Sequence, residues 1–402
     1  MSRQYITGCT AAAEAAKLAA VEVIAAYPIT PQTHIVQTLS QDVYNGVLDA
    51  VFVPVESEHS AMSATVGASI TGARAFTASS SQGLALMHEV LPYAAGLRLP
   101  IVMAIANRSV ASPVTIFTDH QDSLPQRETG FMQFYAESCQ DIFDLILLAY
   151  KVTENKDVLL PAMVCFDGFF LSHISEPVEI PEAEEVAAFV PRTKPQYPTM
   201  DLEHPRSFNA MAFPEHFEEF QRDKFVSMAK AASVFDEAAK EFQQRFGRLH
   251  SRIETFFCED ADWILIGLGS MMGTVRTCVE ELRAKGEKVG MIAIKAYRPF
   301  PVQDVVDALK NCKGVGVMDR DVGYGTGGIV YQDVSRSLYH LDKKPHLSNY
   351  ILGLGGRDVT KKTVYKCFEQ VKTWKDAQAS DGNDVFWPDE NTKVWDTWGV
   401  GE

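Results

Sequence analysis

Three polar residues lie just beyond predicted strands and carry groups that bind small acids. Thr30, Glu58 and Arg108 each follow the end of a short apolar run by two to four residues. In doubly wound sheets, ligands bind in the crevice beyond the carboxyl ends of the strands. A hydroxyl, a carboxylate and a guanidinium at such an edge would form a site for a small carboxylic acid, because Arg binds carboxylates in a bidentate manner.

Each of these residues also has a purely structural interpretation. Thr30 lies in a turn between Pro28 and Pro31. Glu58 stands at the start of a predicted helix, where the helix dipole favours an acidic residue, and Arg108 can form a surface ion pair. Residue types and spacing do not show that the three side chains converge, so both interpretations stay open at this level.

Other motifs give weaker indications. His59 and His120 lack the partner spacing of a metal site, so no metal is expected on this chain. The segment 79–83 lacks both the nucleophile-elbow and the phosphate-loop patterns, and we interpret it as tight packing between a strand and a helix. The glycine-rich segment 267–273 follows a predicted strand, but its spacing differs by one residue from that of a dinucleotide-binding loop.

The overall composition narrows the class of protein. With 46% hydrophobic and 22% charged residues the chain is typical of a globular protein, and its net charge of -15 argues against a nucleic-acid partner. Residues 1–6 lack an apolar signal core, and the Ala-rich run 11–26 is interrupted by charges, so we expect a cytoplasmic protein with no membrane attachment. Seven cysteines without close spacing predict no iron–sulfur cluster or zinc site on this chain.

The first 175 residues alternate short β-rich runs with helical stretches. This pattern predicts a doubly wound α/β domain, whose strands would bring the three polar residues to one edge. The predicted strands cover 21–26, 51–55, 75–77, 101–106 and 159–166, and the predicted helices cover 60–69, 83–95 and 141–151.

Residues 176–260 differ in texture. They begin with Pro- and Glu-rich sequence, which predicts an extended linker, and continue with an amphipathic helix over 217–246 that ends at Gly247. We expect this helix to clamp the domains on either side of it. Its predicted apolar stripe consists of Phe225, Met228, Ala232, Phe235, Ala239 and Phe242.

The pattern of residues 261–376 predicts a second α/β domain. Residues 377–402 are expected to form a polar C-terminal extension, which contains Trp387, Trp395 and Trp398. In the second domain, strands are expected at 263–266, 289–294 and 314–318, and helices at 272–283 and 302–309.

The order of several motifs resembles that of pyruvate:ferredoxin oxidoreductases, which belong to the 2-oxoacid:ferredoxin oxidoreductase family. The resemblance is close over the first 175 residues and looser over 246–248, 297–301 and Asp319. It implies an α-type subunit whose first domain binds the pyrimidine of thiamine diphosphate and whose second domain is transketolase C-terminal-like. The motifs are Tyr27-Pro28-Ile29-Thr30-Pro31, Ser57-Glu58, Phe76-Thr77-Ala78-Ser79, Ser81-Gln82-Gly83-Leu84, Asn107-Arg108, Asp119-His120-Gln121-Asp122 and Phe166-Asp167-Gly168-Phe169.

The resemblance also implies roles for individual residues. Glu58 would contact N1′ of the aminopyrimidine and favour the tautomer that removes the proton from C2. Arg108 would hold the substrate carboxylate, and Thr30 would bond to an oxygen of the substrate. The residues implied to contact the cofactor, beside Glu58, are Tyr27, Pro28, Ile29 and Gln82.

Thiamine enzymes also require a Gly-Asp-Gly motif followed by Asn for magnesium and the diphosphate, and the sequence has none in a suitable place; Asp381-Gly382-Asn383 has no strand before it. The resemblance therefore implies a β-type subunit that brings the diphosphate site, Mg²⁺ and a [4Fe-4S] cluster. It further implies γ- and δ-type or other electron-transfer subunits, and ferredoxin as the acceptor. Because ferredoxins are usually acidic, an acidic chain is not the expected docking surface for one.

The implied reaction converts a 2-oxo acid and CoA to an acyl-CoA, carbon dioxide and two low-potential electrons. Pyruvate is the expected substrate. The segment 112–117 departs from the commonest pyruvate versions, which leaves branched or aromatic 2-oxo acids such as an aryl glyoxylate open. A non-catalytic assembly subunit and a transketolase-type or dehydrogenase-type half-enzyme are the alternatives of other classes.

Overall fold

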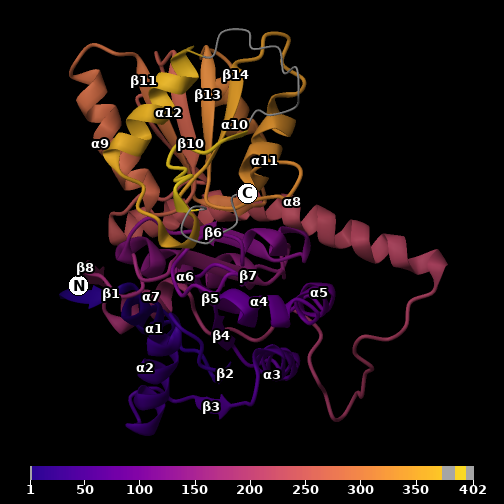
Figure 1. Cartoon of the computed structure of the whole chain (residues 1–402). Helices are drawn as coiled ribbons and strands as arrows, with labels where there is room; N and C mark the ends of the chain where they lie inside the picture. The colour runs from indigo at the N-terminus through magenta and orange to yellow at the C-terminus, as the bar shows by residue number, and fades with distance from the viewer. Residues whose placement is uncertain (1, 374–384, 395–402) are drawn as a thin grey trace. The chain divides into compact units, whose positions relative to one another are not determined.

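The computed structural model describes residues 2–373 and 385–394 and divides the chain into two compact units (Figure 1). The first unit comprises Met1–Glu254 together with the short segments Leu268–Ser270 and Ile294–Pro301. The second comprises most of the chain from Thr255 onward. Trp395 and Trp398 of the predicted C-terminal extension, and the segment Asp381-Gly382-Asn383, lie outside the described residues.

A sheet of seven strands forms the centre of the first unit. Neighbouring strands are parallel except for the edge strand β12, which is antiparallel to β6. The central strands β5 and β7 are buried along their whole length, as expected for strands covered on both faces. In spatial order the strands are β12 (Ala296–Arg298), β6 (Met132–Tyr135), β7 (Ala162–Asp167), β5 (Val102–Asn107), β4 (Ala75–Ser79), β2 (Val23–Ala26) and β3 (Val51–Pro54).

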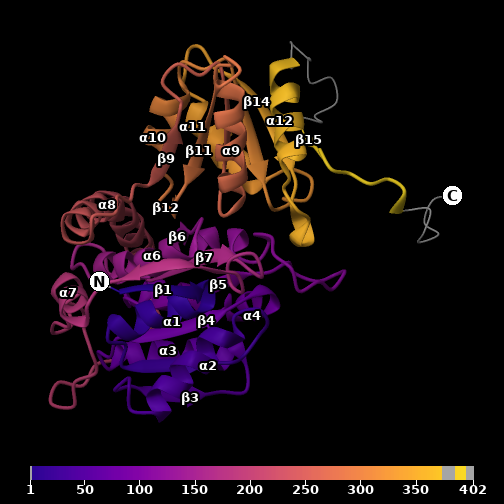
Figure 2. The same ribbon diagram turned by 90° about the vertical axis from the view of Figure 1, so that its left-hand side faces the viewer.

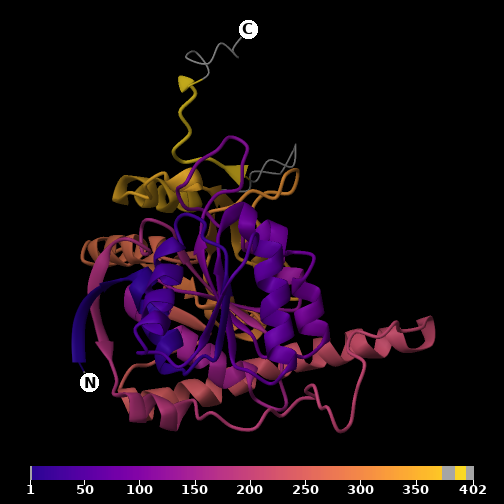
Figure 3. The same cartoon turned by 90° about the horizontal axis from the view of Figure 1, so that it is seen from below.

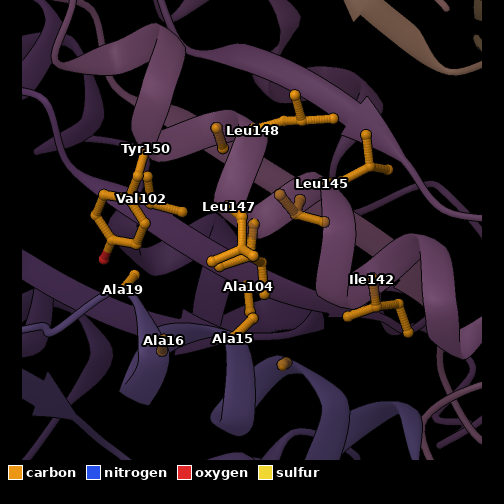
Figure 4. Packing of buried hydrophobic residues seen from close by; sticks show 14 of the residues in the cluster. Ala15, Ala16, Ala19, Val102, Ala104, Ile142, Leu145, Leu147, Leu148 and Tyr150 are labelled. Carbon is orange, nitrogen blue, oxygen red and sulfur yellow. The ribbon is translucent and has the colours of Figure 1, made fainter. Parts of the chain in front are cut away.

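Helices cover both faces of this sheet (Figure 3). On one face lie α1 (Gly8–Leu18), α2 (Thr33–Tyr44) and α6 (Cys139–Thr153), and on the other lie α3 (Glu58–Ile70), α4 (Ser81–Met87) and α5 (Leu91–Gly96). The small side chains of α1, including Ala15 and Ala16, let it approach α6 closely, beside Leu145 and Leu147 (Figure 4). The doubly wound α/β architecture expected for this part of the chain is confirmed.

The chain reverses its direction of travel across the sheet at β2. The strand after β2 joins the sheet on one side as β3, and the next one joins on the other side as β4. Ligands bind at such a switch point, beyond the carboxyl ends of the strands. Thr30 and Glu58 follow β2 and β3 and therefore lie at this position.

Two predictions about the first unit were wrong in detail. The single helix expected over 83–95 is two helices, α4 and α5, because the chain turns between them. The start of the predicted linker is ordered: β8 (Ser175–Ile180) pairs antiparallel with β1 (Ser2–Thr7), and α7 (Ala183–Phe189) follows with a capping box. Regular pairing with a strand at the other end of the first domain replaces the extended connector that its prolines suggested.

The long helix α8 (Pro214–Phe246) ends at Gly247, whose φ of 75° is the left-handed conformation that glycine favours at this position. Its C-terminal half packs on α6 and α7, with Phe235 and Phe242 buried. Phe225, however, is 76% exposed, so the buried stripe is shorter than the sequence suggested. The expected role of this helix as a clamp between domains stays a prediction.

The second unit contains a sheet of six strands with helices on both faces (Figure 2). The helices α9 (Met271–Arg283) and α12 (Lys361–Thr373) pack together, as do α10 (Val302–Leu309) and α11 (Ile329–Leu338). In spatial order the strands are β15 (Val385–Phe386), β14 (His346–Ile351), β13 (Gly314–Asp319), β10 (Trp263–Gly267), β11 (Val289–Ile294) and β9 (Ile253–Phe256). The predicted strands and helices of this region agree with the observed ones to within one residue.

Among the described residues, no helix is long and apolar enough to cross a membrane.

Candidate functional site

Arg108 and Thr30 come together at the carboxyl edge of the first sheet. Arg108 Nη1 donates to the backbone carbonyl of Thr30 at 2.9 Å, and Arg108 Nε donates to the carbonyl of Thr115 at 3.0 Å. The two carbonyls fix the plane of the guanidinium. Its remaining N–H groups can then meet a carboxylate without a further loss of side-chain freedom.

Glu58 lies at the first position of α3, directly after Ser57, whose hydroxyl caps the helix by accepting from the amide of Ser60. The Glu58 side chain is 7% exposed, and its carboxylate rests against Gly83 in the first turn of α4. A Cβ at position 83 would lie 2.5 Å from Glu58 Oε1 and 2.7 Å from the hydroxyl of Ser79. A side chain at position 83 would therefore require Glu58 or Ser79 to move, in agreement with the tight strand-to-helix packing predicted for residues 79–83.

Three hydroxyls on the same strand and turn have no hydrogen-bond partner within the described part of the chain. They belong to Thr77, Ser79 and Ser80, and all three residues are fully buried. A buried polar group without a partner costs about 1–3 kcal/mol, so three of them, with Ser79 beside the Glu58 carboxylate, indicate a place where a polar ligand completes the bonding.

The other residues expected at the site lie around these groups. The backbone carbonyl of Tyr27 accepts from the side-chain amide of Gln32 at 2.8 Å, which fixes the turn that contains Pro28 and Ile29. Gln82 is half-buried, and its side-chain carbonyl lies beside the hydroxyl of Ser81 at the start of α4. The turn after β2 and the turn after β4 are therefore both ordered by polar side chains.

The segment that follows Arg108 combines a polar and an apolar function. Its Thr115 carbonyl holds the guanidinium, while Val114 and Ile116 are exposed, and the ring of Phe117 packs 5.2 Å from that of Phe169. Substitutions in residues 112–117 can thus change the apolar surface beside Arg108 without changing the backbone group that holds it.

Asp122 links the two sides of the site and received no role from the sequence. One of its carboxylate oxygens accepts from the backbone amides of Ser81 and Arg108, each at 2.9 Å. The other accepts from the side chain of Asn107 at 2.7 Å and the amide of Ser123 at 2.8 Å. The motif Asp119-His120-Gln121-Asp122 marked this region, but only the structure shows which of its members reaches the site.

The pKa of Asp122 gives a testable dependence of stability on pH. Burial raises the pKa of Asp122 from 3.8 to about 6, against the lowering effect of Asn107 and the two backbone amides. The folded state therefore binds more protons than the unfolded state between about pH 4 and 6, and the contribution of this group to the free energy of unfolding decreases as pH rises through that window, by about 3 kcal/mol. We expect chemical denaturation to show this decrease in the parent relative to Asp122→Asn, and parallel pH profiles would contradict it.

His120 and Asp167 hold a neighbouring part of the sheet edge. His120 Nε2 lies 3.1 Å from Asp167 Oδ1, and Asp167 also accepts from the hydroxyl of Thr118 at 3.1 Å and from the amide of Ser270 at 2.9 Å. The histidine thus orders its loop. The glycine-rich segment around Gly269 approaches the same carboxylate closely, which accounts for a small residue there without a dinucleotide.

The carboxyl edge of this parallel sheet thus carries a buried carboxylate, Glu58, and a guanidinium held by two carbonyls, Arg108. Two family models match the chain. "Pyruvate flavodoxin/ferredoxin oxidoreductase, thiamine diP-bdg" covers residues 14–240, and "Pyruvate:ferredoxin oxidoreductase core domain II" covers residues 261–364.

Similar proteins agree with this assignment. Pyruvate synthase subunit PorA of Pyrococcus horikoshii is 51% identical over 87% of this chain and 89% of its own length. Ketoisovalerate oxidoreductase subunit VorA of the same organism is 46% identical over 92% of this chain and 94% of its own length. The chain belongs to the 2-oxoacid:ferredoxin oxidoreductase family, as an α-type subunit of an oxidoreductase.

Two solved structures share the fold. A 2-oxoglutarate:ferredoxin oxidoreductase from Magnetococcus marinus is similar with a TM-score of 0.71 and 23% sequence identity. The match covers 92% of this chain and 65% of the chain in that structure. A split-gene transketolase is similar with a TM-score of 0.52 and 12% sequence identity. The match covers 92% of this chain and 98% of the transketolase chain. The predicted fold, a thiamine-pyrimidine-binding domain followed by a transketolase C-terminal-like domain, is confirmed.

Proposed function

We propose that this chain supplies the pyrimidine-binding and substrate-binding half of a thiamine diphosphate site in a cytoplasmic complex that converts pyruvate and CoA to acetyl-CoA, carbon dioxide and two electrons. The observation that carries the proposal is the buried Glu58 carboxylate, packed against Gly83 beside the Ser79 hydroxyl, which lacks a hydrogen-bond partner among the described residues. Thiamine diphosphate supplies, when bound, the nucleophilic carbon that attacks the 2-oxo group.

Glu58 has the role of holding a proton at N1′ of the aminopyrimidine. A carboxylate in a buried position can share a proton with a ring nitrogen, and general acid–base catalysis of this kind contributes about 10²- to 10⁴-fold to rate. Gly83 keeps the carboxylate in place from one side. The residues proposed to border the ring, with Glu58, are Tyr27, Pro28, Ile29 and Gln82.

Arg108 has the role of binding the substrate carboxylate, and the Thr30 hydroxyl that of donating to a substrate oxygen. Support comes from the guanidinium, which the carbonyls of Thr30 and Thr115 hold at the sheet edge. Since Thr30 is small and neutral, the site offers one cation for one carboxylate, which favours a monoacid over a diacid.

The partner subunits remain part of the proposal. The sequence has no Gly-Asp-Gly motif, so a β-type subunit is proposed to bring Mg²⁺, the diphosphate site and a [4Fe-4S] cluster. Electron-transfer subunits of γ and δ type and a ferredoxin complete the scheme. The names of the relatives, each a subunit of a pyruvate synthase or a ketoisovalerate oxidoreductase, support an assembly of several chains.

Purification of the native complex, followed by assay of 2-oxo acids with CoA and a viologen acceptor, tests the function. We expect the highest kcat/KM with pyruvate and a lower one with 3-methyl-2-oxobutanoate, the substrate class of the VorA relatives, and with phenylglyoxylate. A higher kcat/KM with either of the larger acids would reassign the substrate. Absence of CoA-dependent viologen reduction with every acid would remove the proposed reaction.

Gly83→Ala is expected to lower activity strongly while the protein stays folded. The added Cβ would stand 2.5 Å from Glu58 Oε1, so the carboxylate must move, and a displacement of about 1 Å in a catalytic group can cost on the order of 10²-fold in rate. The measurement is kcat of the reconstituted complex with saturating pyruvate. Gly67→Ala, in the same layer of helices where a Cβ meets nothing within 4 Å, is the matched control and should retain parent activity.

A further inference from the structure

The Asp122 carboxylate bonds to two backbone turns that approach the site from different strands. Ser81 opens α4 after β4, and Arg108 follows β5. Their amide groups donate to the same oxygen, Asp122 Oδ2, at 2.9 Å each. Because Asp122 is 1% exposed, this oxygen is shielded from bulk solvent, and the distance between the two amides is set by the size of one carboxylate oxygen.

Ser81 needs such an anchor. Its φ of 51° lies in the left-handed region, which costs a residue other than glycine about 1–2 kcal/mol and persists only where neighbouring bonds enforce it. Two bonds do so here: the amide to Asp122, and the hydroxyl, which donates to the carbonyl of Ser109 at 2.5 Å. Both bonds tie the α4 turn to the segment around Arg108.

Each anchored turn carries one half of the chemistry proposed above. Two residues beyond Ser81 lies Gly83, which packs on the Glu58 carboxylate, and the Arg108 side chain is the proposed contact of the substrate carboxylate. A shift of either amide would change the separation between the ring side and the carboxylate side of the site.

We propose that Asp122 is a positioning residue that sets the distance between the Glu58 side and the Arg108 side of the site, and that it acts on the substrate through Arg108. The proposal rests on the proposed function of Arg108 and adds a residue that touches neither substrate nor cofactor. An aspartate is required because four donors surround the side chain, two on each oxygen. An Asn side chain has one acceptor oxygen and would turn two N–H donors toward one of the pairs.

The test is a double-mutant cycle in the reconstituted complex, with Asp122→Asn, Arg108→Ala and the double variant. The readouts are KM and kcat for pyruvate and the concentration of thiamine diphosphate at half-saturation. In the parent, we expect Asp122→Asn to lower kcat/KM on the order of 10²-fold, mainly by raising KM. In the Arg108→Ala background, we expect the same substitution to lower kcat/KM by less than about threefold. Such non-additivity is the signature of one residue acting through the other.

Asp144→Asn is the matched control, because Asp144 on α6 is also fully buried and bonds to two basic side chains, Arg248 at 2.7 Å and His250 at 2.9 Å. It should lower the melting temperature and leave the KM for pyruvate unchanged. If Asp122→Asn does not fold, Asp122→Glu retains both acceptor oxygens and displaces them by one methylene. A parent KM in the folded Asp122→Glu complex overturns the proposal.

Two results separate failure of this inference from failure of the proposed function. If Asp122→Asn lowers kcat/KM by the same factor with and without Arg108, the two residues act independently and the positioning role is overturned, while the role of Arg108 stands. If Arg108→Ala alone leaves the KM for pyruvate unchanged, the proposed function of Arg108 fails and the positioning role fails with it.

Discussion

Replacement of Glu58 with Gln is expected to lower kcat of the assembled enzyme by about 10²- to 10⁴-fold. Gln is nearly isosteric with Glu, so the contact with Gly83 is kept. The neutral amide, however, cannot take up a proton and pass it to a ring nitrogen as a carboxyl group can. Binding of thiamine diphosphate should weaken much less than kcat falls. The measurement is kcat with saturating pyruvate and CoA, together with a titration of the cofactor by protein fluorescence.

The matched control is Glu56→Gln, two residues earlier. Glu56 is exposed and accepts from the hydroxyl of Ser60, so it has the same chemistry in a position open to water. Its substitution should change kcat by less than about twofold, as expected for an exposed side chain with a local bond. Retention of parent kcat and normal cofactor dependence by Glu58→Gln would instead favour a non-catalytic assembly role for this chain.

The sequence was sufficient to predict the fold because the periodic signals in both units are strong. Strands such as β5 and β7 are continuous apolar runs, and the small-residue stretch in α1 leaves room for a neighbouring helix. The failures lie where local signals compete with tertiary pairing. Prolines between 177 and 198 suggested an extended linker from residue 176, but β8 obtains its partner from β1, more than 160 residues away in sequence, which no local pattern reveals.

The candidate site was predictable in residue types but not in its support. Thr30 and Arg108 were expected at one sheet edge, and the structure joins them by a bond to a backbone carbonyl. Backbone carbonyls carry no sequence signal, so the contribution of Thr115 could not be foreseen. Asp122 belongs to the motif Asp119-His120-Gln121-Asp122, but the four groups that donate to it come from three separate segments of the chain. Only the fold brings these donors to one carboxylate.

These supports explain how half a site can be organised by one chain before any partner adds to it. The guanidinium of Arg108 and the carboxylate of Glu58 are fixed by groups of the same unit, through Thr115, Gly83 and Asp122. Pre-organised groups lose little freedom when a ligand binds, so the interactions they make contribute more to affinity and rate. The positions of the Glu58 carboxylate and the Arg108 guanidinium are therefore set by contacts within this chain.

Replacement of Arg108 with Ala is expected to lower kcat/KM for pyruvate by about 10²- to 10³-fold, mostly through a higher KM. The loss would follow from the removal of the cation that is proposed to bind the substrate carboxylate. Arg108→Lys should recover only part of it, since an ammonium group cannot bond to the carbonyls of Thr30 and Thr115 and also present a planar pair of donors. Initial-rate measurements over a wide range of pyruvate concentration give the required separation of KM from kcat.

Arg127→Ala serves as the control, because Arg127 lies in the same connection between β5 and β6, in the short 3-10 helix Leu124–Glu128, and pairs with the exposed Glu128 at 3.3 Å. An exposed ion pair contributes about 0–1 kcal/mol to stability, so this variant should retain the parent KM and melting temperature. The parent and Arg127→Ala should have the same, lowest KM for pyruvate. Arg108→Lys should have a higher KM, and Arg108→Ala the highest. If Arg108→Lys were to match the parent, charge alone would account for binding, and the fixed plane of the guanidinium would have no part in holding the substrate.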